Sequence, residues 1–206
     1  MRIANTPNQV TRGYGACERF LATRRAHLAD KLIPSELREG LLIDIGCGAW
    51  PLFLCSAKFH KRIGIDKTID KHTRSQLQGM DVTVIPYDAE RYPSLPFASD
   101  VASAITLLAV MEHMEKSTIG VLFLEIKRVL KKGGLFIVTT PAAWTRPILT
   151  TLSKMRLVSP AEIAEHKHYY TKKELHEVLL NTGYEKRNIQ SGVFELGCNL
   201  WATARK

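Results

Sequence analysis

The sequence predicts an α/β protein built on a parallel sheet whose successive strands end in acidic residues. Three short apolar runs follow one another along the chain, and they lead into Asp44, Asp66 and Asp88. Short apolar runs bounded by glycine or turn residues are typical of strands buried in a parallel sheet. In such sheets ligands bind at the carboxyl ends of the strands, so the three acids indicate a ligand site.

A pair of glycines follows the first of these strands. Gly46 and Gly48 stand one residue apart, where they permit a tight turn and a close approach of the backbone to a ligand. Pro51 suits the start of a helix, where a missing N–H costs nothing. Strand, glycine loop and helix start together mark the place where an α/β sheet binds a nucleotide-like ligand. A dinucleotide fingerprint would need a third glycine where Pro51 stands, so we expect a different ligand.

The acids describe the chemistry of that ligand. A carboxylate at a strand end repels a pyrophosphate but attracts a cation or an ammonium group, which favours a cationic ligand near Asp44. Asp66 lies twenty positions after Gly46, a spacing at which an acid commonly meets ribose hydroxyls. With Asp88 as the third acid, the pattern suits a cationic, adenosine-containing ligand.

Six stretches resemble a known family, and they occur in its order within residues 43–184: IDIGCG, GID, YDAERYP, LLAVMEHM, RVLKKGGLFIVTTP and HYYTKKELHEVLLNTGY. The chain resembles the class I S-adenosylmethionine-dependent methyltransferases, in particular their small-molecule branch (methyltransferase domain type 11). The resemblance implies a Rossmann-like fold: a seven-stranded, mostly parallel sheet with helices on both faces and an antiparallel C-terminal hairpin. We expect that hairpin over 184–189 and 193–204, with a turn at Ser191-Gly192.

The same resemblance implies S-adenosylmethionine as the cofactor and assigns residues to it. Asp44 is expected to hold the methionine ammonium group, Asp66 to accept from the ribose hydroxyls and Asp88 to accept from the adenine amino group. The glycine loop and the following strand ends supply the remaining expected contacts, which are Gly46, Cys47, Gly48, Lys67, Ala89, Leu107 and Leu108. The alternative for Asp44 is an acid that only orders its loop, and for Asp88 an acid that only caps a turn.

Two further groups of residues are expected on the acceptor side. Glu112-His113 follows the fourth strand, and an imidazole with an ordinary pKa of about 6.5 suits a general base. The alternative is that this pair only positions a loop. The resemblance places His166, His168 and Tyr169 near the acceptor, with ordinary packing as the alternative. We expect no metal site, because His166 and His168 are two residues apart and no nearby acid completes a ligand set.

The chain is expected to form a single domain over 1–206. Residues 1–40 should form an N-terminal arm and helix, with Tyr14 or Arg19 near the cofactor, and 141–170 should form an insertion that caps the substrate.

Local signals predict where two helices begin and end. Ser117 is expected to cap a helix that stops at Gly133-Gly134. Thr171 and Glu174 have the spacing of a capping box, which predicts a second helix start.

Composition excludes several classes of protein. The chain has 206 residues and 45% hydrophobic content, and no apolar run approaches the roughly 20 residues that a membrane span needs. The first residues lack the apolar core of a signal peptide, and the four cysteines have no metal-ligand spacing. We therefore expect a cytoplasmic enzyme, either a monomer or a homodimer.

Three hypotheses about function stay open. The first is methyl transfer to a small-molecule, saccharide or lipid-linked acceptor. The second is an RNA methyltransferase, because a net charge of +9 and a pI of about 9.5 favour an anionic partner. Against it, the sequence has no long basic run, no appended RNA-binding module and no Asn-Pro-Pro-Tyr motif after the fourth strand. The third is a cofactor-binding module without turnover.

Overall fold

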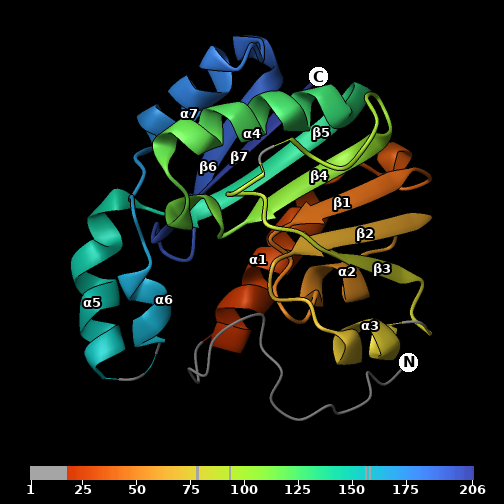
Figure 1. Cartoon of the computed structure of the whole chain (residues 1–206). Helices are drawn as coiled ribbons and strands as arrows, with labels where there is room; N and C mark the ends of the chain where they lie inside the picture. The colour runs from red at the N-terminus through yellow and green to blue at the C-terminus, as the bar shows by residue number, and fades with distance from the viewer. Residues whose placement is uncertain (1–17, 78, 93, 156, 158) are drawn as a thin grey trace.

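The computed structural model describes residues 18–206 except 78, 93, 156 and 158. Seven strands form one sheet in the order β3-β2-β1-β4-β5-β7-β6 (Figure 1). The strand bounds are β1 Leu41–Ile45, β2 Lys61–Asp66, β3 Val82–Pro86, β4 Ala102–Leu108, β5 Leu130–Pro141, β6 Ile189–Phe194 and β7 Asn199–Arg205. Neighbouring strands from β3 to β5 are parallel, whereas β7 runs antiparallel to both β5 and β6. The structure therefore confirms the predicted fold, a mostly parallel sheet of seven strands with an antiparallel C-terminal hairpin.

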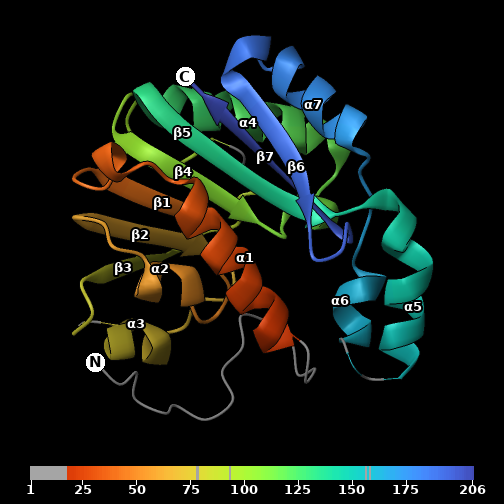
Figure 2. The same ribbon diagram turned by 180° about the vertical axis from the view of Figure 1, so that it is seen from behind.

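Helices cover both faces of the sheet. The α-helices are α1 Glu18–Leu32, α2 Leu52–Ser56, α3 Lys71–Leu77, α4 Lys116–Val129, α5 Arg146–Lys154, α6 Pro160–Ala164 and α7 Lys172–Asn181. Short 3-10 turns lie between them: η1 Ser35–Leu37, η2 Met111–His113, η3 Ala143–Thr145 and η4 Lys186–Asn188. Helices α4 and α7 lie in front of the sheet in Figure 1, and α1 crosses the opposite face in Figure 2. Helices α5 and α6 stand apart from both layers, beyond the ends of β4 and β5.

The core consists of two apolar clusters, one on each face of the sheet. On one face, α4 presents a stripe of buried residues at helical spacing, namely Ile119, Leu122, Phe123 and Ile126. On the other face, α1, α2 and α3 bury Ala29, Leu54 and Leu77. Because both faces are covered, the strands between them are apolar almost throughout, as in β4, where every residue before the last is buried.

The direction of the chain reverses beside β1. From β1 it steps outward through β2 to β3, then returns to place β4 on the other side of β1. The carboxyl ends of β1 and β4 therefore flank a topological switch point, where open α/β sheets bind their ligands.

The two predicted boundaries of α4 are wrong. Its N-cap is Glu115, in extended backbone, and Ser117 lies inside the helix. The helix ends at Val129 rather than at the glycines, because the fully buried Leu130 takes extended backbone and pairs with Ala102 of β4. Gly133, with φ +77°, instead serves the irregular start of β5, where its N–H donates to the Lys206 carbonyl.

The predicted tail is partly wrong. Residues 186–188 form η4 instead of a strand, and the turn of the hairpin lies at 195–198 rather than at Ser191-Gly192. Gly192 is inside β6, opposite Trp201, and a Cβ there would come within 2.7 Å of the Trp201 ring. That glycine therefore makes room for a tryptophan and does not turn the chain.

Two local points complete the fold. The capping box is confirmed, because Thr171 accepts from the Glu174 N–H while the Glu174 carboxylate accepts from the Thr171 N–H. Of the residues expected in the N-terminal arm, Tyr14 lies outside the described residues and Arg19 is an exposed residue of α1. No helix in the described residues is long and apolar enough to cross a membrane.

Candidate active site

A cavity of about 340 Å³ opens at the carboxyl ends of the central strands. Its walls come from α1, the loops after β1, β2, β3 and β4, the α5–α6 segment and the β6–β7 turn. Nine of the ten expected cofactor residues line it: Asp44, Gly46, Cys47, Gly48, Asp66, Lys67, Asp88, Ala89 and Leu108. The tenth, Leu107, is fully buried in the core and does not line the cavity.

Asp44 is a buried carboxyl at the floor of this cavity. It lies opposite Thr106 in the β1–β4 register, and the Thr106 hydroxyl donates a 2.6 Å hydrogen bond to Asp44 Oδ1. Burial raises the pKa of Asp44 to about 7, the Thr106 hydrogen bond opposes that rise, and the nearby Asp66 charge adds to it. In the described residues no ion pair offsets the Asp44 charge, so a cation placed beside this carboxyl would stabilise its charged form.

The glycine loop bends closely around the end of β1. Gly46 has a φ of +72° and Gly48 a φ of +77°, conformations that favour glycine. A Cβ on Gly46 would also overlap the Val110 side chain. The side chain of Cys47 points away from the loop, because its Sγ would lie 2.7 Å from a Cβ on Gly64 of β2. Burial raises the pKa of the Cys47 thiol, so Cys47 offers the cavity its backbone and not a thiolate.

Asp66 joins the ends of β2 and the glycine loop. Its Oδ2 accepts from the Gly48 N–H at 3.0 Å, and its Oδ1 accepts from both the N–H and the hydroxyl of Thr68, at 2.8 and 2.6 Å. These contacts fix the direction of a buried carboxylate that lines the cavity.

Asp88 caps the turn that follows β3. Its Oδ1 accepts from the N–H groups of Glu90 and Arg91, both at 3.1 Å. The alternative expected from the sequence, an acid that caps a turn, therefore holds for Oδ1 of Asp88. Asp88 also lines the cavity, as does the neighbouring Ala89.

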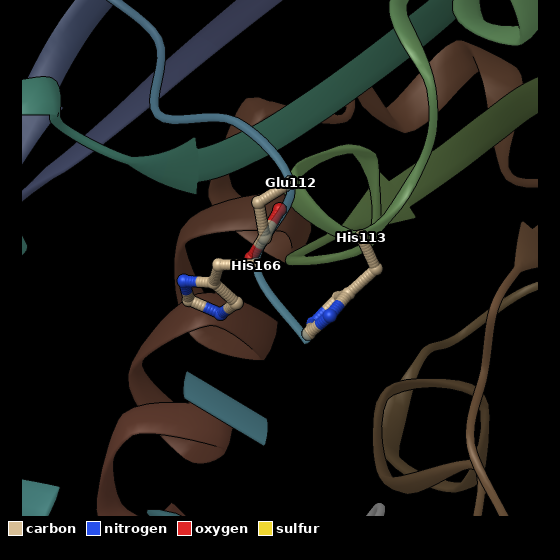
Figure 3. Close-up of side chains that lie close together, drawn as sticks. All are labelled: Glu112, His113 and His166. Carbon is tan, nitrogen blue, oxygen red and sulfur yellow. The ribbon is translucent and has the colours of Figure 1, made fainter. Parts of the chain in front are cut away.

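Glu112, His113 and His166 also line the cavity, and their side chains lie close together (Figure 3). Glu112 is 1% exposed and accepts from the Thr140 hydroxyl at 3.2 Å. The rings of His113 and His166 pack edge to face, with 4.7 Å between their centroids. Burial and the His113 ring lower the pKa of His166 to about 4, which leaves its imidazole neutral near pH 7.

The other two residues expected on the acceptor side do not line the cavity. His168 lies 3.3 Å from the Glu174 carboxylate and packs against the Tyr170 ring. Tyr169 packs its ring against His166 and lies beneath the Arg146 guanidinium. Tyr169 therefore packs behind a wall residue, whereas His168 contacts residues outside the cavity lining.

Comparison with known protein families shows that a model of the methyltransferase domain family matches residues 17–189. The chain belongs to this methyltransferase family. None of the curated proteins compared with it matches significantly.

Solved structures share the fold of this methyltransferase. A SAM-dependent methyltransferase from Archaeoglobus fulgidus is 16% identical with a TM-score of 0.66, over 90% of this chain and 94% of that chain. Another from Mesorhizobium loti is 17% identical with a TM-score of 0.67, over 90% and 100%. An O-methyltransferase candidate from Nostoc punctiforme is 18% identical with a TM-score of 0.67, and this chain spans 57% of its length. The family and the fold identify a class I S-adenosylmethionine-dependent methyltransferase, and S-adenosylmethionine is its cofactor.

Sequence reasoning expected the N-terminal helix and the 141–170 insertion near the ligands, but it did not identify which of their residues line the methyltransferase cavity. Helices α1, α5 and α6 contribute mainly apolar residues, namely Leu21, Ala22, Ala26, Ile148, Leu149, Leu152 and Ile163. The β6–β7 turn contributes Glu195, Cys198 and Asn199. These segments are distant in sequence from the glycine loop, and no motif marks them. The apolar residues of 148–152 were visible in the sequence, but only the fold shows that they face the cavity.

The cavity of the methyltransferase is acidic although the whole chain is basic. Its lining includes six carboxyl side chains, Asp44, Asp66, Asp88, Glu90, Glu112 and Glu195. Two basic side chains, Arg25 and Lys67, face them. Such a lining favours a cationic ligand and disfavours a polyanion.

Proposed function

We propose that this methyltransferase transfers a methyl group from S-adenosylmethionine to a small molecule that carries an apolar portion, including a lipid-linked one. The observation that carries this proposal is the mixed lining of one cavity. Asp44, Asp66, Asp88 and the glycine loop line it together with apolar side chains of α1, α5 and α6. Glu112, His113 and His166 lie on the wall of the same cavity.

The residues present fit the cofactor. Asp44 would meet the ammonium group, because a buried carboxyl with a raised pKa gains most from a neighbouring positive charge. Asp66 would accept from the ribose hydroxyls, and Oδ2 of Asp88 would accept from the adenine amino group, since Oδ1 is engaged by the turn. The positive φ values of Gly46 and Gly48 support a backbone that curves around the ligand.

The chemistry asks little of the protein beyond alignment. When bound, S-adenosylmethionine supplies an electrophilic methyl group on a sulfonium sulfur. The protein holds the acceptor atom in line and excludes water, and alignment of this kind corresponds to effective molarities of roughly 10⁵ M or more. If the acceptor is a hydroxyl, its proton must leave as the methyl group arrives, and an imidazole nitrogen of His113 is the candidate to take it.

We propose the insertion over 141–170 as the acceptor cap. Helix α5 has no fully buried residue, yet Ile148, Leu149 and Leu152 line the cavity. An apolar wall of this kind removes apolar acceptor surface from water, at about 25 cal/mol per Å².

The acidic cavity argues against RNA as the acceptor. A polynucleotide would bring phosphates toward the six carboxyl side chains of the lining. The net charge of +9 therefore belongs to the outer surface and gives no support for an RNA strand in the cavity.

The test is transfer of a labelled methyl group from S-adenosylmethionine into cell extract, with and without nuclease. We expect label that resists nuclease and enters the organic phase on extraction. Label that disappears with nuclease treatment would replace this proposal with RNA methylation. Cofactor binding without label in any fraction, across extracts from several sources, would favour a binding module.

A further inference from the structure

We propose that Glu112, His113 and His166 form a binding site for one divalent metal ion of the zinc class. One carboxylate oxygen and two imidazole nitrogens are the donor atoms, and these atoms lie within 4.8 Å of one another. Figure 3 shows the three side chains drawn together from η2 and from the segment that follows α6. No spacing in the sequence marks this set, because 53 positions separate His113 from His166.

The donor set selects the class of metal. Two imidazoles and one carboxylate form a ligand set that zinc takes in catalytic sites, where a fourth position stays open to water or substrate. Imidazole nitrogen suits zinc, copper, iron and nickel, whereas magnesium and calcium prefer oxygen ligands throughout. A zinc-class ion is therefore favoured over magnesium.

The geometry needs only a small contraction. Donor atoms on one tetrahedral zinc ion lie roughly 3.4 Å apart, given bonds of about 2.0–2.2 Å. The present separations, none wider than 4.8 Å, must then close by at most about 1.4 Å. His113 is only half-buried at the cavity wall, so rotation of its side chain can supply much of this movement.

The backbone holds the two segments together without a metal. The N–H groups of Lys167 and His168 both donate to the Glu112 carbonyl, at 2.8 and 3.3 Å. The Lys167 ammonium also pairs with Glu90 at 2.6 Å and with Glu115 at 3.2 Å. His166 is thus tied beside Glu112 by the residues that follow it, so a metal ion would meet ligands that are already ordered.

Two atoms around the cluster fit a metal site. The Thr140 hydroxyl donates to Glu112 Oε2 and fixes the direction of that carboxylate, as outer hydrogen bonds do around metal ligands. The Nδ1 atom of His166 is buried and accepts or donates no hydrogen bond within the described residues. A buried imidazole nitrogen of this kind gains a partner when it binds a metal.

The position of the cluster suggests a role for the ion. All three ligands line the cavity, so the open coordination position would face the cavity. There the ion would bind the oxygen of a hydroxyl acceptor and lower the pKa of that hydroxyl, so that its proton leaves to solvent water, and His113 would act as a ligand instead of a base. This role rests on the proposed methyl transfer, whereas metal binding itself does not.

Metal binding is tested on the full chain without an affinity tag, after removal of metals with a chelator and dialysis. Zinc affinity is measured by competition with a chromophoric chelator, and cobalt is added as a visible-absorption probe. We expect one zinc ion per chain, no displacement by excess magnesium, and a cobalt spectrum without a thiolate charge-transfer band. His166→Gln should lower zinc affinity at least about 100-fold, since even outer-shell changes cost about 10- to 100-fold.

His60→Gln is the matched control, because His60 is an exposed histidine just before β2 and does not line the cavity. It should bind zinc as the unaltered chain does. His113→Gln serves as a second variant if His166→Gln loses its thermal transition. The proposal would be overturned if the unaltered chain bound no zinc, or if a folded His166→Gln or His113→Gln variant bound zinc as tightly as the unaltered chain. A thiolate band in the cobalt spectrum would also overturn it. Loss of S-adenosylmethionine binding by the unaltered chain would instead refute the proposed function and leave the metal result standing.

Discussion

At the scale of single residues, Asp44 shows how a ligand site costs stability. The side chain is 4% exposed, and burial raises its pKa to about 7. An aspartate in the unfolded chain has a pKa of about 3.9. Between about pH 3.9 and about pH 7, Asp44 is therefore protonated in the folded protein but ionised in the unfolded chain. Because ionising Asp44 costs more in the folded state, it opposes folding. In the proposed function, the ammonium group of the cofactor would supply the positive charge that offsets this carboxylate.

The Asp44→Asn variant should be more stable than the unaltered chain at pH 8 without cofactor. A folded pKa above the unfolded one means that stability is greatest below about pH 4 and falls as pH rises to about 7. The asparagine removes this loss, on the order of 1–4 kcal/mol, and its amide oxygen can still accept from Thr106. Urea unfolding at pH 5 and pH 8 measures the free energy of unfolding of both proteins. A variant less stable than the unaltered chain at pH 8 would contradict the assignment.

Cofactor affinity should depend on the same group. As pH falls below about 7, protonation of Asp44 removes the partner of the ammonium group, so affinity should drop by up to about tenfold per pH unit. Above roughly pH 8 the amino group of the cofactor itself loses its proton. Isothermal titration from pH 5.5 to 9 should show greatest affinity between these limits. The acid limb should be missing in Asp44→Asn, and its persistence there would assign it to another group.

At the scale of elements, α7 and α5 depend on different kinds of support. Helix α7 begins with a reciprocal capping box, and two N–H donors at its start are satisfied by side chains within four residues of sequence. Backbone and hydroxyl hydrogen bonds from Thr171, with a contribution from His168, lower the pKa of Glu174 to about 2 despite partial desolvation. Helix α5 buries no residue fully, and its apolar side chains Ile148, Leu149 and Leu152 line the cavity instead of the core.

Loss of the cap should weaken the fold and spare the site. Thr171→Ala removes the oxygen that accepts from the Glu174 N–H, which should lower the free energy of unfolding by about 1 kcal/mol. Thr118→Ala makes the same change inside α4, where alanine is the better helix former, and should not destabilise. Guanidinium unfolding compares the two variants. Equal stability of both would show that the cap contributes nothing.

Loss of the apolar wall should weaken acceptor binding and spare the fold. Leu152→Ser on α5 should weaken acceptor binding about tenfold or more, because burial of a leucine side chain is worth roughly 1.5–3 kcal/mol, and should leave cofactor affinity unchanged. Leu124→Ser on α4 is the control, since Leu124 is an exposed leucine that does not line the cavity. Steady-state kinetics with the acceptor found in the labelling experiment measure both. An unchanged KM for the acceptor in Leu152→Ser would remove α5 from the acceptor site.

The sequence predicted those features whose causes are local. Asp44, Asp66, Gly46 and the capping box of Thr171 are each specified by a few neighbouring residues, and the structure places them as expected. The end of α4 was missed because tertiary pairing of Leu130 with Ala102 outweighs the two later glycines.

Long-range contacts account for the rest of what the sequence did not reveal. The meeting of His166 with Glu112 depends on backbone hydrogen bonds between segments more than fifty residues apart. The apolar wall likewise depends on where α5 stands after β5 ends, which no periodicity in 141–170 specifies.

At the scale of the whole molecule, the distribution of charge separates the surface from the site. The chain carries a net charge of +9, but carboxyl groups predominate in the cavity lining. The cavity also lies at the switch point between β1 and β4, so the topology of the sheet brings Asp44, Asp66 and Asp88 to one place. The fold thus collects acids that are remote in sequence into the lining of one cavity.

The most direct measurement is equilibrium binding of S-adenosylmethionine to the full chain, Asp66→Asn and Asp81→Asn. Asp81 is an exposed aspartate that lies outside the cavity, and its φ of +54° is one that asparagine tolerates. Titration is run below the thermal transition of each variant. We predict saturable binding by the unaltered chain and by Asp81→Asn. Asp66→Asn should bind at least about tenfold more weakly, since one charged hydrogen bond is worth about 1.5–3 kcal/mol. Equal affinity of all three proteins would contradict the placement of the cofactor beside Asp66.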